Sequence, residues 1–146
     1  MKNEFDKALA QARNIDEIEG ILLPLLKEWH RVHGSLGFVS GTLFSDGPEF
    51  VQRNIKRLAD YTSALRLKHP FPIFSGHDVL YNGRMDTLAE SKLPYLERRT
   101  RMLAFWKTVV TCGSITDVFM MPGWERSEGA RDEHRSALQM GIVVHY

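Results

Sequence analysis

The chain has 146 residues, the size of one ordinary domain, and its content of 43% hydrophobic and 25% charged residues is that of a globular protein. Lys and Arg number 19 against 18 Asp and Glu, so the formal charge of +1 leaves no basic excess for general binding to a nucleic acid polymer or an acidic membrane. A single cysteine, Cys112, excludes an internal disulfide framework and a multi-cysteine zinc site. We find no apolar run long enough to span a bilayer and no signal-peptide core, and therefore expect a cytoplasmic protein.

The first 34 residues predict a helical arm. Apolar residues between Ile18 and Trp29 recur at helical spacing, and Gly34 suits the position that follows a helix. Pro24 interrupts this stripe and predicts a kink or a break. We expect a shorter helix over residues 5–13. The arm is expected to cover the sheet described next or to form a dimer contact.

From residue 35 onward, strand patterns alternate with helix patterns. Strands are expected over 36–43, 71–74, 115–121 and 142–145, and helices over 50–67, 93–111 and 127–140. Ser91 is a candidate N-cap for the second of these helices, and a polar loop is expected over 76–83. The strands are mainly apolar and do not alternate with polar residues, which is typical of a parallel sheet buried on both faces.

The sequence therefore predicts an α/β fold. We expect a three-layer sandwich of the flavodoxin or Rossmann-like kind, with a mainly parallel sheet of four or five strands formed by residues 35–146 and preceded by the helical arm over 1–34. Ligands of such sheets bind beyond the carboxyl ends of the strands, and this rule selects the loops over 40–48, 75–83 and 122–129.

The last of these loops leads into the helix that carries the most informative side chains. Ser127 is a good N-cap, a helix N-terminus favours anions, and Gly129 allows close approach of a ligand or backbone. Glu133 and His134 occupy the inward face of this helix. A buried carboxylate costs free energy unless it is paired or functional. Three interpretations of Glu133 are therefore open. It is a residue of the functional site, it forms a salt bridge with an arginine such as Arg101, or it lies at the solvent-exposed edge of the apolar face of this helix.

The stretch 117–141 resembles the nucleoside 2-deoxyribosyltransferase-like superfamily. It contains an apolar strand, then Pro-Gly-Trp-Glu-x-Ser-x-Gly-Ala-x-x-Glu, then Ala-x-x-x-Gly. The Pro-Gly-Trp form is closest to a small bacterial branch, and the superfamily includes nucleoside 5′-monophosphate N-glycosidases. Weaker similarity covers 38–42 and 74–77. The superfamily motif falls on Ser127, Gly129, Glu133, Ala137 and Gly141.

The resemblance implies a covalent glycosyl mechanism. Glu133 would attack the anomeric carbon of a nucleoside or nucleotide, and Ser127 would hold a 5′-phosphate. Trp124 would stack on the base or, alternatively, cover the strand end. The remaining substrate-binding residues implied by the resemblance are Gly129, Ser40, Gly41, Thr42 and His77.

One departure from the superfamily pattern keeps a second function open. The helix over 93–111 lacks the acidic residue that members usually carry there, because the nearest acid, Glu97, lies too far upstream. The primary expectation is an N-glycosidase or deoxyribosyltransferase-like enzyme that acts on a nucleoside or nucleotide, and the alternative is a non-catalytic nucleotide-binding or protein-interaction module. We expect no cofactor, no metal and a homodimer. His30 and His33 have the spacing of metal ligands but lack a completing carboxylate or cysteine.

Overall fold

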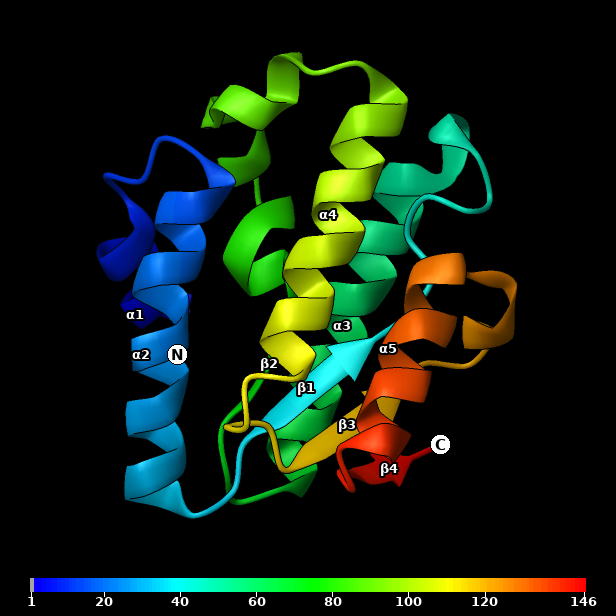
Figure 1. Cartoon of the computed structure of the whole chain (residues 1–146). Helices are drawn as coiled ribbons and strands as arrows, with labels where there is room; N and C mark the ends of the chain where they lie inside the picture. Colours follow the sequence, from blue (N-terminus) through cyan, green and yellow to red (C-terminus); the bar gives the residue numbers. More distant parts are fainter. Residues whose placement is uncertain (1) are drawn as a thin grey trace.

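A computed structural model describes residues 2–146 and contains one sheet flanked by helices (Figure 1). The described helices and strands, in chain order, are α1 (Lys2–Leu9), α2 (Ile15–His33), β1 (Gly37–Ser40), α3 (Val51–Lys68), β2 (Ile73–Ser75), α4 (Tyr95–Val110), β3 (Asp117–Met120), α5 (Glu128–Gln139) and β4 (Val143–His145), with several short helical turns between them.

The sheet is parallel throughout and has the strand order β2-β1-β3-β4. The central strand β1 pairs with β2 through Phe38 and Phe74 and with β3 through Phe38 and Val118. Every residue of β1 and β2 is buried, as expected for strands covered on both faces. The predicted α/β sandwich is confirmed, with four strands.

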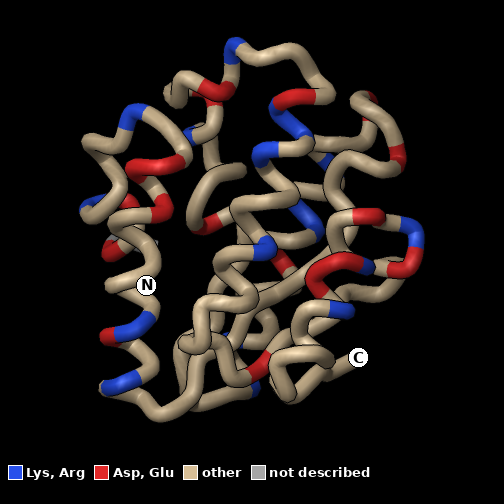
Figure 2. The backbone as a smooth tube through the Cα atoms, viewed as in Figure 1, with Lys and Arg blue, Asp and Glu red and all other residues tan. Residues whose placement is uncertain are grey.

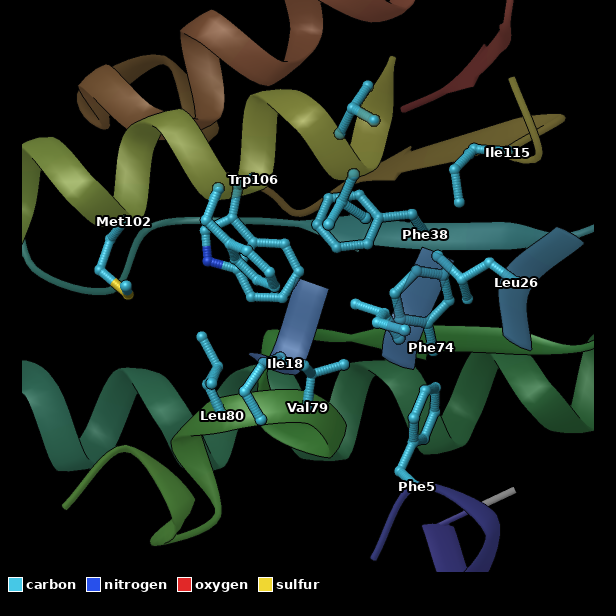
Figure 3. Packing of buried hydrophobic residues seen from close by; sticks show 14 of the residues in the cluster. Phe5, Ile18, Leu26, Phe38, Phe74, Val79, Leu80, Met102, Trp106 and Ile115 are labelled. Atoms are coloured by element: carbon cyan, nitrogen blue, oxygen red, sulfur yellow. The ribbon is translucent and has the colours of Figure 1, made fainter. Parts of the chain in front are cut away.

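Alternate residues of β1, β2 and β3 enter two separate hydrophobic clusters. Val39 and Phe119 pack with Leu58 of α3 on one face of the sheet. Phe38 and Phe74 belong to the larger cluster on the other face, which also contains buried residues of α1, α2, α4 and α5. Figure 3 shows Phe38, Phe74 and Trp106 at the centre of this larger cluster.

The N-terminal arm is part of the larger cluster. Phe5 of α1 lies 5.7 Å from Phe74, measured between ring centroids, and Ile18, Leu22 and Leu26 of α2 are fully buried. The arm therefore covers the sheet, which was one of its two expected roles.

The break expected at Pro24 is absent, because α2 runs continuously from Ile15 to His33. A proline inside a helix costs roughly 3 kcal/mol. Burial of a single leucine or isoleucine side chain contributes about 1.5–3 kcal/mol, so the apolar face of α2 outweighs that cost.

Two further local expectations were wrong. The polar loop expected over 76–83 contains a π-helical turn, His77–Tyr81, whose Asp78 carboxylate accepts hydrogen bonds from the Ser75 backbone N–H (2.9 Å) and from Arg66 (2.8 Å). Ser91 does not cap α4, which begins one residue after Pro94. A residue that precedes proline avoids helical geometry, and Leu93 accordingly has an extended ψ of 150°.

No helix within residues 2–146 has the length and apolarity needed to cross a bilayer.

Candidate functional site

A cavity of about 770 Å³ opens at the carboxyl ends of the strands. All three loops predicted to meet at this edge of the sheet contribute to its wall. The predicted site residues on the wall are Ser40, Gly41, His77, Ser127, Gly129 and Glu133. Sequence reasoning therefore located the cavity and six of its lining residues.

Glu133 is a buried carboxylate on the inner face of α5 and retains only 9% of its exposed surface. The Ser40 hydroxyl donates a hydrogen bond to its Oε2 atom. Burial raises the pKa of Glu133 to about 7, and the negative charge of Asp132 adds to the increase, while the hydrogen bond from Ser40 opposes it. Glu133 therefore holds its proton more readily than an exposed glutamate does.

The arginine partner considered for Glu133 is engaged elsewhere. Arg101 lies 3.3 Å from Glu90 and 3.4 Å from Asp16, measured between its Nη2 atom and a carboxylate oxygen of each. Within residues 2–146, Glu133 forms no salt bridge. Its carboxylate therefore lines the cavity without a neutralising cation.

The position of Ser40 follows from the alternation of side chains along β1. Phe38 and Ser40 point to the face of the sheet that α5 covers, whereas Val39 points toward α3. Gly41 comes next, where a Cβ atom would lie 2.6 Å from the Met121 sulfur. A glycine at this position lets the end of β1 pass close to the chain that leaves β3.

The N-terminus of α5 forms another part of the wall. Ser127 is buried, and its Oγ accepts a hydrogen bond of 3.2 Å from the Ala130 N–H, which confirms the predicted N-cap. A Cβ atom on Gly129 would lie 3.4 Å from Leu103, an ordinary contact distance. Sterics alone do not demand glycine there, and its effect is to keep the wall beside Ser127 free of a side chain.

Thr42 and Trp124, two predicted substrate-binding residues, do not line the cavity. Thr42 donates a hydrogen bond of 3.1 Å to the Gly123 carbonyl and so joins two of the loops. Trp124 packs against His134, with 4.3 Å between ring centroids, and against the edge of the larger cluster. Of the two interpretations of Trp124, the structure favours a cover over the strand end.

Sequence reasoning missed the contribution of α4. This helix lines the cavity with Tyr95, Arg98, Arg99, Met102, Leu103 and Trp106, and the spacing of residues 95, 99, 102 and 106 is the signal that could have identified this face. None of these α4 residues is acidic, and the exposed Glu97 is not among them.

Two further residues give the cavity polar groups of different kinds. The Trp106 indole N–H donates a hydrogen bond of 3.0 Å to the Tyr81 hydroxyl, and burial raises the pKa of Tyr81, so this phenol stays protonated. Asp86, which follows the π-helical turn, places a second carboxylate on the wall. Within the part of the chain that the structure describes, no cluster of three or more His, Cys, Asp and Glu side chains could hold a metal ion.

Comparison with known proteins gives one partial match. The sequence profile of a family described as a domain of unknown function (DUF4406) is similar to residues 78–146, less than half of the chain. The searches of curated proteins and of solved structures found no match. The similar segment contains α4, Ser127 and Glu133 but not Ser40.

Proposed function

We propose that this protein cleaves the N-glycosidic bond of a nucleoside 5′-monophosphate, with Glu133 as the nucleophile. The observation that carries the proposal is the buried, cation-free carboxylate of Glu133 on the wall of a large cavity, held by the Ser40 hydroxyl. A purely structural carboxylate at this depth would be expected to have a positive partner, because an unpaired buried charge is costly. The resemblance of residues 117–141 to the nucleoside 2-deoxyribosyltransferase-like superfamily supports the same role.

The reaction would proceed in two displacements. A carboxylate oxygen of Glu133 forms a bond to C1′ of the sugar while the bond from C1′ to the base nitrogen breaks and its electron pair passes to the base. The base takes up a proton from solvent or from a side chain on the wall such as His77. Water then attacks C1′ and gives up one proton to solvent, while the bond between C1′ and the Glu133 oxygen breaks and restores the carboxylate. Attack by a second base in place of water would give transfer instead of hydrolysis.

The proposed seat of the 5′-phosphate is the N-terminus of α5 beside Ser127. A helix N-terminus presents N–H groups and a positive dipole end to an anion. Arg98 and Arg99 add positive charge to the same cavity. Since the whole chain has a formal charge of only +1, attraction of a phosphate must come from such local groups.

The test is release of free base from a panel of nucleosides and nucleoside 5′-monophosphates, measured by chromatography. Wild-type protein should release base from at least one monophosphate, and Glu133→Gln should reduce kcat by at least about 1000-fold, because covalent catalysis is lost. The matched control is Glu97→Gln, which removes an exposed carboxylate from α4 and should leave kcat unchanged. Retention of turnover by the Glu133 variant would refute the assignment.

A non-catalytic nucleotide-binding module on the same fold is the second candidate. The observation that favours it is the absence of an acidic side chain among the α4 residues on the cavity wall. A monophosphate that raises the melting temperature of the wild-type protein without release of base would support this alternative.

A further inference from the structure

A second cavity, of about 510 Å³, adjoins the first. The two share Phe44, Ser45, Tyr95 and Arg99 as lining residues, so they lie side by side and are described below as two parts of one cleft. Ser127 lines the first part, and its neighbours in sequence, residues 126 and 128, line the second. The second part therefore begins beside the proposed seat of the 5′-phosphate.

The second cavity is the more basic of the two. Arg99 of α4, Arg126 of the short helical turn Trp124–Arg126 and Arg131 of α5 line it, and Glu128 is its one acidic lining residue. Its lining thus has an excess of two positive charges, whereas acidic and basic residues are interspersed over the chain as a whole (Figure 2). Three arginines contributed by three elements form a local anion-attracting field.

Arg99 is paired with the Glu128 carboxylate, but the present contacts of the other two arginines leave their guanidinium groups able to bind an anion. Arg131 donates one hydrogen bond, of 2.7 Å, to the Glu125 carbonyl. Arg126 lies 3.5 Å from an Asp46 carboxylate oxygen, and its side chain is 55% exposed. A guanidinium carries several N–H donors in a fork that matches phosphate oxygens, so one carbonyl or one carboxylate does not saturate it.

We infer that the second cavity binds a second phosphate group, and that the protein prefers nucleoside 5′-diphosphates to 5′-monophosphates. The inference rests on the proposed function for the location of the nucleoside and its first phosphate. A β-phosphate would extend from Ser127 past Arg99 toward Arg126 and Arg131. Cleavage would be unchanged at the sugar, because the bond from C1′ to the base nitrogen breaks and the products are free base and a sugar 5-diphosphate.

The test uses two probes that need no knowledge of the base, inorganic phosphate and pyrophosphate, with dissociation constants measured by calorimetry at fixed ionic strength. Arg131→Gln should weaken pyrophosphate binding about tenfold or more, the effect of losing one charge-assisted hydrogen bond, and should change phosphate binding by less than about twofold. Arg126→Gln should likewise weaken the binding of pyrophosphate while leaving the binding of phosphate nearly unchanged.

Arg135→Gln is the matched control. Arg135 lies one turn after Arg131 on α5, is likewise exposed, and contacts Asp132 at 3.4 Å, but it lines neither cavity. This variant makes the same change in net charge and should bind both probes like the wild type. Equal loss of pyrophosphate affinity in the Arg131 and Arg135 variants, or no loss in either, would overturn the inference.

Failure of this inference can be told apart from failure of the proposed function. If no nucleotide releases base while the Arg131 variant selectively loses pyrophosphate, the glycosidase assignment fails and the diphosphate site stands. If base is released from monophosphates and diphosphates with equal kcat/KM in both wild type and Arg131→Gln, the diphosphate preference fails and the glycosidase assignment stands.

Discussion

Glu133 links the stability of the protein to pH. Its pKa of about 7 in the folded protein exceeds the ordinary value of 4.5, so folding is accompanied by proton uptake between these two values. The resulting contribution to the free energy of unfolding is fully present below about pH 4.5 and is lost as the pH rises through 7.

Glu133→Gln should therefore be more stable than the wild type at about pH 8, by roughly 3 kcal/mol, and similar to it at about pH 4.5, because the neutral amide carries no desolvated charge. Urea denaturation at both pH values measures the two free energies. Glu97→Gln, an exposed carboxylate change, serves as the control and should follow the wild type. A constant difference between Glu133→Gln and wild type across this range would contradict the assigned pKa.

The same carboxylate predicts the pH dependence of catalysis. A nucleophilic carboxylate must be ionised, so kcat/KM of the wild type should rise with pH through a midpoint near 7. Ser40→Ala removes the hydrogen bond that favours ionised Glu133, and the midpoint should move to higher pH. A pH-rate profile of both proteins checks the direction, and a midpoint that stays in place or falls in Ser40→Ala would count against Glu133 as the titrating nucleophile.

The sequence predicted the inward direction of Glu133 but not its partner. Helical spacing from Ser127 is local information, and it placed residue 133 on the buried face correctly. The Ser40 hydroxyl lies 93 positions away along the chain, and only the pairing of β1 with β3 brings it to α5. Side-chain pairs of this kind depend on tertiary geometry that no local pattern contains.

At the scale of elements, α2 is a structural part of the sheet domain. Leu22 is fully buried in the larger cluster, so Leu22→Ala should lower the free energy of unfolding by about 2–5 kcal/mol through lost burial and the cavity that remains. Leu67→Ala on α3 is the matched control, since that side chain is 90% exposed and its loss should change stability by less than about 0.5 kcal/mol. Chemical denaturation measures the free energy of unfolding of both variants. If Leu22→Ala lowered it no more than Leu67→Ala does, α2 would not be part of the hydrophobic core.

Long amphipathic elements were predictable from sequence, whereas the segment between β2 and α4 was not. α3 and α5 began within a few residues of their expected positions because apolar periodicity and the Ser127 cap are local signals. The π-helical turn His77–Tyr81 depends on Asp78 binding Arg66 of α3, a contact with another element. The α4 arginines line the cleft for a related reason, since which face of α4 meets the cavity depends on where its neighbours pack.

At the scale of the whole molecule, the near-zero formal charge conceals an uneven distribution. The basic residues of the second cavity lie beside the N-terminus of α5, the proposed phosphate seat, and acidic residues elsewhere on the chain balance them. Composition argues against a general polyanion-binding surface, but a count of charges has no spatial content and gave no indication of a local basic cleft.

The parallel order of the sheet also determines when the cleft can exist during synthesis. β1 must pair with β3 across 80 positions, shown by Gly37 and Asp117, and the cleft is completed by α5, which follows β3 in the chain. Contacts so distant in sequence form late in folding. A nascent chain therefore cannot assemble the proposed phosphate seat before α5 has been made, and until then it should lack the proposed activity.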